Sequence, residues 1–171
     1  MASKLEKILS DWISYNSNVR KLSHNSTQSY SLDLRSFCTF TFKGNTNISR
    51  ADFTKIKLKD FRNWIVFLKS QSVGSTSICR KISSLKNFLS WLETIHNEKN
   101  PDIEKLEPPR KDKNLPRPNS IKEIEKLIKT IEKSKEKKWV ILRNKAIFIL
   151  LYTCGMRISE ALDLKRSVIP F

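Results

Sequence analysis

The chain has 171 residues, of which 33 are lysine or arginine and 17 are aspartate or glutamate, so its formal net charge is +16. This length allows one ordinary domain or two small ones. A positive charge of this size exceeds what solubility needs and indicates a polyanionic partner, such as DNA, RNA or an anionic membrane surface. Because the basic residues are spread over the whole chain, the charge argues against a neutral enzyme with a basic tail.

The cysteines, Cys38, Cys79 and Cys154, argue against the usual cysteine frameworks. They are odd in number and far apart, and only His24 and His96 could assist them as ligands. We therefore expect no disulfide framework and no structural zinc site. Each cysteine falls in an apolar helical setting, which favours reduced thiols in the core. The N-terminus mixes charges with apolar residues, and no apolar run reaches the ~18 residues of a membrane span, so we expect a cytoplasmic protein without a signal peptide.

Residues 1–97 predict four helices. An apolar stripe at helical spacing runs through residues 5–13. After a break near residues 21–26, a second helix follows, which Ser26 or Thr27 could cap.

Two further helices complete this region. The third includes Phe61 and Leu68, and Gly74 interrupts the chain after it. The fourth is the clearest, because its apolar side chains step by four and three residues: Ile78, Ile82, Leu85, Leu89 and Leu92. No segment here alternates apolar and polar residues over the length of a strand, so we expect an all-α fold.

A proline-rich stretch divides the chain. Prolines at the density found in residues 98–119 prevent a regular helix and favour an extended connector. We therefore assign residues 1–97 to one domain, residues 98–119 to a linker and residues 120–171 to a second region. Ser120 and Glu123 form a capping box for the helix that opens the second region.

The most informative stretch is LLYTCGMRISEALDL, residues 150–164. An apolar helix predicted over Val140–Thr153 runs up to Gly155, a glycine typical of the position past a helix C-cap. Arg157 and Glu160 follow. Withdrawing a guanidinium from water at the end of so buried-looking a helix requires a partner, which could be Glu160 or a nucleic-acid phosphate.

This stretch resembles the first arginine motif of the tyrosine recombinases, the family of the phage integrases and Xer-type enzymes. The motif reads approximately Leu-Leu-Tyr-x-x-Gly-x-Arg-x-x-Glu-x-x-x-Leu. The matching residues are Leu150, Leu151, Tyr152, Gly155, Arg157, Glu160 and Leu164. Residues 27–37, 75–92 and 115–120 also resemble, in order, two helices of the family's N-terminal domain and the entry to its catalytic domain. The resemblance implies a core-binding bundle of four or five helices with a SAM-like fold, a proline-rich linker and the first helices of a catalytic domain.

The resemblance also implies site-specific DNA recombination through a 3′-phosphotyrosine, without a metal or cofactor. It assigns catalytic roles to Arg157, which would bind the phosphate, and to Glu160, which would orient the basic groups of the site. The family's nucleophile is a tyrosine far beyond the arginine motif, whereas Tyr15, Tyr30 and Tyr152 all precede Arg157. We therefore expect the chain alone to be inactive, and Tyr152 to be a core residue.

DNA contacts are expected on the second and fourth helices, which approach DNA in the family. The fourth helix carries a face of short polar and basic side chains, which suits the major groove. The predicted contacts are Thr27, Gln28, Ser31 and Arg35 on the second helix, and Ser77, Arg80, Lys81 and Lys86 on the fourth. An ordinary solvated helix face would show a similar pattern.

Together these features predict the DNA-binding part of a tyrosine site-specific recombinase. Its partners would be double-stranded DNA and, in a longer protein, other recombinase protomers. We expect no membrane or small-molecule ligand, and a monomer for this chain. Two alternatives stay open: a stand-alone helical DNA-binding regulator without catalysis, and a basic module that binds an acidic protein. The motif is compatible with three roles. One is the resolution of chromosome dimers, which serves chromosome partition, and the others are DNA integration and DNA inversion.

Overall fold

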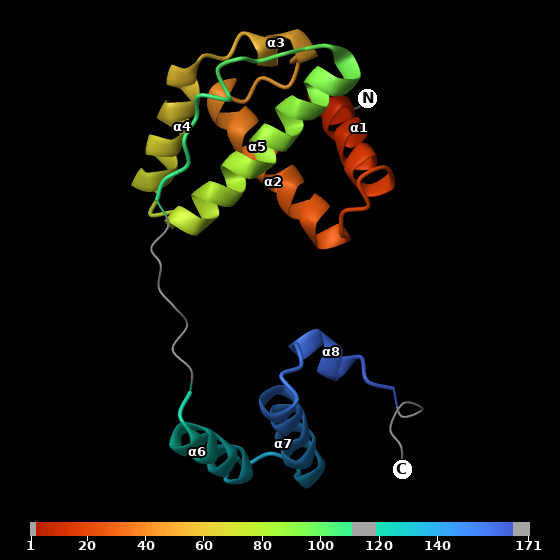
Figure 1. Cartoon of the computed structure of the whole chain (residues 1–171), viewed down its shortest axis with the longest axis vertical. Helices are drawn as coiled ribbons and strands as arrows, with labels where there is room; N and C mark the ends of the chain where they lie inside the picture. The colour runs from red at the N-terminus through yellow and green to blue at the C-terminus, as the bar shows by residue number, and fades with distance from the viewer. Residues whose placement is uncertain (1–2, 111–118, 166–171) are drawn as a thin grey trace. The chain divides into compact units, whose positions relative to one another are not determined.

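The structure, a computed structural model, describes residues 3–110 and 119–165. Every regular element in these residues is a helix, which confirms the all-α fold class. The helices are α1 (Lys4–Asn18), α2 (His24–Thr41), α3 (Arg50–Thr54), α4 (Leu58–Ser70), α5 (Ser75–His96), α6 (Ile121–Glu132), α7 (Lys138–Thr153) and α8 (Ile158–Leu162) (Figure 1). Two compact units contain them: α1 to α5 in residues 1–113, and α6 to α8 in residues 114–171. Residues 111–118 of the predicted linker and residues 166–171 of the predicted second region lie outside the described residues.

The second helix begins earlier than predicted. The Ser23 hydroxyl accepts a hydrogen bond from Ser26 N at 3.3 Å and satisfies one of the N–H groups that a first helical turn leaves unpaired. Because α2 starts at His24, the predicted caps Ser26 and Thr27 are wrong, and both residues lie inside the first turn.

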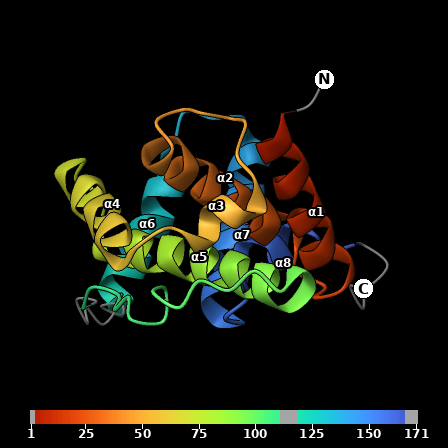
Figure 2. The ribbon, with the colours of Figure 1, turned by 90° about the horizontal axis from the view of Figure 1, so that it is seen from above.

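The core of the first unit is built around α2 and α5, which cross and pack against each other (Figures 1 and 2). Trp12 of α1 meets Phe88 of α5 edge-on, with 5.3 Å between ring centroids. Phe37 of α2 meets Trp64 of α4 in the same way at 5.0 Å. Edge-to-face aromatic pairs add to the free energy gained from burying their area. Trp12 also stacks on Tyr30 of α2, with 6.2 Å between ring centroids, so this ring of α1 contacts both α2 and α5.

The first part of the predicted linker packs onto this unit instead of extending from it. Ile103 and Leu106 are buried in the core. Asn100 is also buried, and its side-chain amide donates to the backbone oxygens of Phe53 at 2.7 Å and Ile56 at 2.9 Å. The prolines prevent a regular helix in this segment. Its apolar side chains nevertheless pack on the bundle, and the Asn100 amide is hydrogen-bonded there.

In the second unit, α6 begins at the predicted capping box. Ser120 N donates to Glu123 Oε2 at 2.7 Å, and Glu123 N donates to Ser120 Oγ at 3.3 Å. Each residue therefore satisfies a backbone donor of the other. α7 packs against both α6 and α8.

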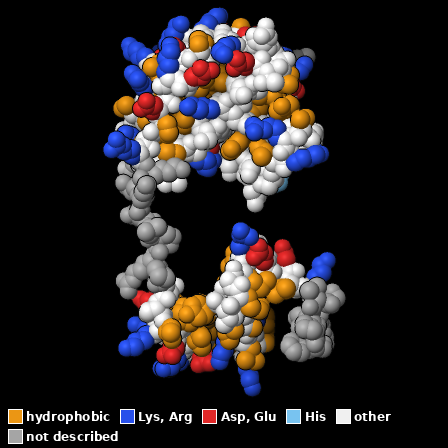
Figure 3. Space-filling model, in the orientation of Figure 1, with side chains coloured by type: hydrophobic (Ala, Val, Ile, Leu, Met, Phe, Trp, Pro, Cys, Tyr) orange, Lys and Arg blue, Asp and Glu red, His pale blue; other side chains and the backbone are white. Residues whose placement is uncertain are grey.

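The apolar helix α7 was predicted to be buried, but it is not. No residue of α7 is fully buried, and Tyr152 is 49% exposed. Cys154 is exposed too, whereas Cys38 and Cys79 are buried as predicted. The core positions expected for Tyr152 and Cys154 are therefore wrong. The physical reason is that α7 has apolar side chains around its whole circumference, and α6 and α8 do not enclose it. Figure 3 shows hydrophobic side chains gathered on the surface of this unit over α6 and α7.

Replacing Asn100 tests how the 98–110 segment is held. Asn100→Ala removes a donor amide and leaves the buried carbonyls of Phe53 and Ile56 without it. Because an unsatisfied buried polar group costs about 1–3 kcal/mol, we expect the free energy of unfolding to fall by about 2–4 kcal/mol. Urea unfolding followed by circular dichroism measures this loss. Asn63→Ala, at an exposed position of α4, is the matched control, with an expected change within about 0.5 kcal/mol. Equal losses in the two variants would contradict the role of Asn100.

The three thiols should differ in reactivity. Burial raises the pKa of the Cys38 thiol to about 12, against a smaller opposing effect of Arg35, so Cys38 has almost no thiolate at neutral pH. The buried Cys79 thiol donates to Pro109 O at 3.3 Å. We expect iodoacetamide to alkylate Cys154 in the native chain, and Cys38 and Cys79 only after unfolding. Peptide mass spectrometry of labelled samples measures this order, and rapid native labelling of Cys38 would contradict it.

Candidate nucleic-acid interface

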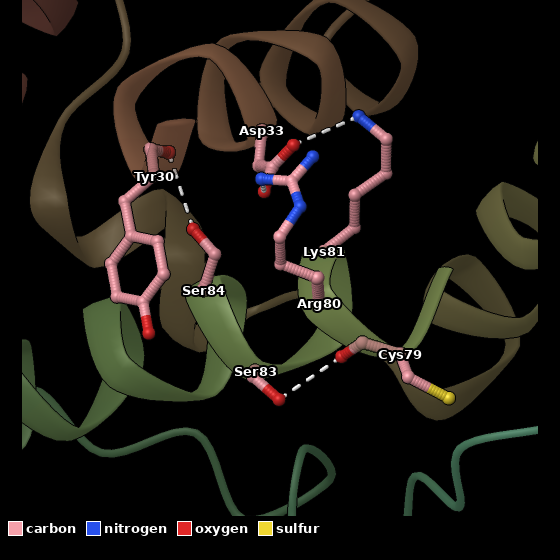
Figure 4. Close-up of polar contacts among 7 residues, drawn as sticks. All are labelled: Tyr30, Asp33, Cys79, Arg80, Lys81, Ser83 and Ser84. Atoms are coloured by element: carbon pink, nitrogen blue, oxygen red, sulfur yellow. Dashed lines mark hydrogen bonds and ion pairs between the residues drawn. The ribbon is translucent and has the colours of Figure 1, made fainter. Parts of the chain in front are cut away.

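A buried carboxylate joins α2 to α5. Asp33 of α2 is only 2% exposed, and its two oxygens bind two basic side chains of α5 (Figure 4). Oδ2 accepts a hydrogen bond from Arg80 Nη1, and Oδ1 accepts one from Lys81 Nζ at 3.0 Å. A buried charge is costly unless it is paired and hydrogen-bonded, and here two cations compensate one anion. We call Asp33, Arg80 and Lys81 the Asp33 cluster, and it keeps a net positive charge.

A further bond fixes the two helices next to this cluster. The buried Ser84 hydroxyl donates to Tyr30 O at 3.2 Å, from α5 to α2 (Figure 4). Arg80 and Lys81 lie one helical turn before Ser84, so their backbone is held beside α2. Their side chains differ in accessibility, because Arg80 is 45% exposed and Lys81 only 15%. Arg80 is therefore accessible to solvent while it is bonded to a buried carboxylate.

The predicted contacts near the start of α2 also differ in accessibility. Gln28 is exposed and Ser31 is half-buried. Thr27 is buried, and its hydroxyl donates to His24 O at 2.8 Å within the helix. Because this side chain is not presented to a ligand, we leave Thr27 out of the interface and keep Gln28 and Ser31.

Arg35, the fourth predicted contact on α2, is exposed and pairs with Glu6 of α1. The guanidinium makes a two-pronged contact with the carboxylate, and Nη2 donates to Oε2 at 2.7 Å. The side-chain hydrogen bond from Arg35 is the largest cause of a lowered pKa of Glu6, and the same bond raises the pKa of Arg35. Exposed pairs of this kind contribute little stability, so a competing phosphate could exchange for Glu6 at low cost.

On α5, one predicted contact lies apart from the others. Ser77, which is exposed, Arg80 and Lys81 lie within about one turn on one side of the helix. Lys86 lies on a different side of α5, where it lines a hollow with Cys79 and with Pro109 of the 98–110 segment that packs onto the first unit. Only the first three therefore form one surface.

Asp33 and Glu6 are site residues that the sequence pattern did not identify. For Asp33 a signal exists, because it lies in phase with Tyr30 and Phe37 on the apolar side of α2. A carboxylate on such a face has to find a cation. For Glu6 no local signal exists, because its partner Arg35 lies 29 residues away.

In the second unit, Glu160 holds Arg157 at the start of α8. The carboxylate accepts hydrogen bonds from Arg157 N and from Arg157 Nη1, each at 2.8 Å. The backbone bond is the largest cause of a lowered pKa of Glu160, followed by the side-chain bond. Arg157 is the N-cap residue, and its side chain is 83% exposed. The guanidinium was expected to be withdrawn from water. It is exposed instead, because the helix before it, α7, is itself exposed to solvent.

Neither a metal centre nor a membrane-spanning helix is found within residues 3–110 and 119–165. No three His, Cys, Asp or Glu side chains gather there as a metal site would require, and no helix there has both the length and the apolarity to cross a bilayer.

Comparison with known proteins supports the resemblance seen in the sequence. The family described as "Phage integrase, N-terminal SAM-like domain" matches residues 9–95. "Tyrosine recombinase XerC" of Rickettsia bellii (strain OSU 85-389) is 30% identical over 165 residues, which cover 96% of this chain and 54% of that protein. The proteins of the same name from Rickettsia prowazekii (strain Madrid E) and Rhodospirillum centenum (strain ATCC 51521 / SW) are each 31% identical over 163 residues. These alignments cover 95% of this chain, and 53% and 48% of the two relatives.

The chain spans about half the length of the curated relatives it matches. No solved structure matches it significantly. The family match covers the helical bundle of the first unit, and the relatives align with nearly the whole chain. The chain therefore belongs to the tyrosine recombinase, or phage integrase, family and contains its N-terminal SAM-like domain.

Proposed function

We propose that this chain binds duplex DNA as part of a tyrosine site-specific recombinase. The observation that carries the proposal is the family match over residues 9–95, because the same residues build the basic surface around the Asp33 cluster. Family membership supports a recombinase role, and DNA is the polyanion that such a role requires. We place this activity in the cytoplasm.

Phosphate neutralisation would supply most of the binding free energy. The net charge of +16 is far above what a small domain needs for solubility. Lysine and arginine side chains that contact phosphates release the counterions condensed on the duplex, and this release favours binding. Arg80 and Arg35 are exposed residues of α5 and α2 that could make such contacts, and Ser77 and Gln28 could add neutral hydrogen bonds.

Arg157 and Glu160 would act in strand cleavage. A guanidinium stays charged and can donate to two non-bridging oxygens of the attacked phosphate, which becomes more negative in the transition state. Glu160 would hold this side chain in place while leaving most of it accessible. The motif resemblance places the nucleophilic tyrosine well after Arg157, whereas Tyr15, Tyr30 and Tyr152 precede it. The chain of 171 residues would therefore bind DNA without cleaving it.

The two units would divide these tasks. Residues 1–97, with the docked residues up to 110, would bind DNA, and residues 120–171 would bring the arginine motif to the same duplex. In a longer protein that contains the nucleophilic tyrosine, other recombinase protomers would join on the DNA. This chain alone would be a monomer, and its binding would involve no membrane and no small-molecule ligand.

Binding to duplex DNA should weaken steeply with salt. If about four to six phosphates are neutralised, raising salt from about 50 to 200 mM should lower the affinity by about two to three orders of magnitude. Fluorescence anisotropy with a random duplex and a duplex carrying inverted-repeat arms measures this. A preference for the repeats supports a site-specific recombinase. Weak binding that does not respond to salt would contradict the proposal and favour an acidic protein partner.

The catalytic assignment can be tested in a recombinase long enough to contain the nucleophilic tyrosine. There, Arg157→Ala should lower the strand-cleavage rate by about 100-fold or more, as expected for losing a donor to transition-state charge. Duplex affinity should stay within about twofold, since one exposed arginine adds little to the total. Arg143→Ala, at an exposed position of α7, is the control and should cleave normally. Normal cleavage by Arg157→Ala would contradict the catalytic role of Arg157, and absence of cleavage in the unmutated protein would favour a DNA-binding protein without catalysis.

A further inference from the structure

We propose that Asp33 is a positioning residue that fixes Arg80 and Lys81 in place for phosphate contact before DNA arrives. The inference rests on the proposed function and assigns a specific role in it to a buried acidic residue. Its basis is an unusual combination in one cluster (Figure 4): the anion is almost fully buried, while one of its two cations is half exposed.

The carboxylate is rigidly held. Asp33 lies on the buried side of α2, where Leu34 and Phe37 are also buried, so its side chain is shielded from solvent. Bonds from this carboxylate therefore tie Arg80 and Lys81 to the core of the unit. The exposed Glu6 differs, because it can turn toward water and release Arg35 without burying an unpaired charge.

Both cations keep donors for a ligand. A guanidinium has five N–H donors and an ammonium has three. In the described part of the chain, Arg80 uses Nη1 for Asp33, Lys81 uses one donor for the same carboxylate, and neither bonds to another acceptor. The exposed edge of Arg80 and the remaining donors of Lys81 can therefore bind a phosphate while Asp33 keeps its contacts.

Two effects of Asp33 on DNA affinity oppose each other. Its negative charge repels phosphate, and its hydrogen bonds remove rotamer freedom that long basic side chains would otherwise lose on binding. Salt screens the repulsion, and the cations lie between Asp33 and solvent, whereas the ordering of the side chains is not screened. The proposal is that ordering exceeds repulsion, and this fixes the sign of the expected effect.

The first experiment compares duplex affinities by fluorescence anisotropy at constant salt. Asp33→Asn raises the net positive charge, yet we expect it to bind about fivefold to tenfold more weakly, because the ordering is lost. Asp33→Glu keeps the charge and moves the carboxylate by one methylene, and we expect a similar loss. Glu93→Gln is the matched control: it removes one exposed carboxylate of α5, paired with Lys99, and should bind as tightly as the wild type or slightly more tightly.

A double-mutant cycle separates positioning from a general loss of structure. If Asp33 acts through Arg80, Asp33→Asn should cost much less affinity in an Arg80→Gln background than in the wild type. A purely structural role would cost the same in both backgrounds and would overturn the inference. Circular dichroism melts show whether each variant is folded at the assay temperature.

If the Asp33 variants do not fold, the wild type still decides the question. The side-chain Nη1–H signal of Arg80 in ¹⁵N-edited NMR should exchange slowly with water before DNA is added, because Nη1 donates to Asp33, and it should change little on binding. A fast-exchanging signal that becomes ordered only with DNA would overturn the proposal. If the wild type does not bind duplex at all, the proposed function fails. If it binds and Asp33→Asn binds equally or more tightly, only the role of Asp33 fails.

Discussion

The pairing of one buried carboxylate constrains the whole arrangement of the first unit. Asp33 lies where α2 meets α5, so the buried charge is tolerable only if α5 turns basic residues toward it. Arg80 and Lys81 occupy those positions, and the bond from Ser84 to Tyr30 in the next turn supports the same register. The contacts of α5 with α2 thereby determine which polar face of α5 remains accessible to a ligand. The basic side chains on that face are held by their bonds to the buried Asp33.

The arginine motif of the second unit is supported differently. Arg157 and Glu160 pair across the first turn of the short helix α8, and both are exposed. Electrostatic stabilisation of a transition state is strongest where water is excluded and donors are held in advance. Among the described residues, Arg157 would supply the donor and Glu160 the orienting carboxylate, but both side chains are exposed to water. The two units therefore differ in how completely each one orders its own arginine, and the proposed DNA binding would depend on the better ordered of the two.

Features set by local spacing could be predicted from the sequence, and features set by distant partners could not. The apolar repeat of α5 and the capping box at Ser120 involve residues within one or two turns, and both are confirmed. Tyr152 and Cys154 were expected in the core because of their apolar neighbours, but burial depends on how many helices cover α7. The docking of residues 98–110 escaped prediction for the same reason: proline density excludes a helix, yet Asn100 finds acceptors more than forty residues away.

The candidate site follows the same division. Glu160 lies three residues after Arg157, so their contact could be inferred from the motif alone. Asp33 lies 47 residues from Arg80 and 48 from Lys81, and the sequence shows only that a carboxylate on an apolar face needs some cation. Arg80 and Lys81 were predicted as ligand contacts, and the fold adds that they are also the counterions of a buried acid. A basic residue with both roles has a fixed position as well as a charge, so its charge alone does not determine its effect on binding.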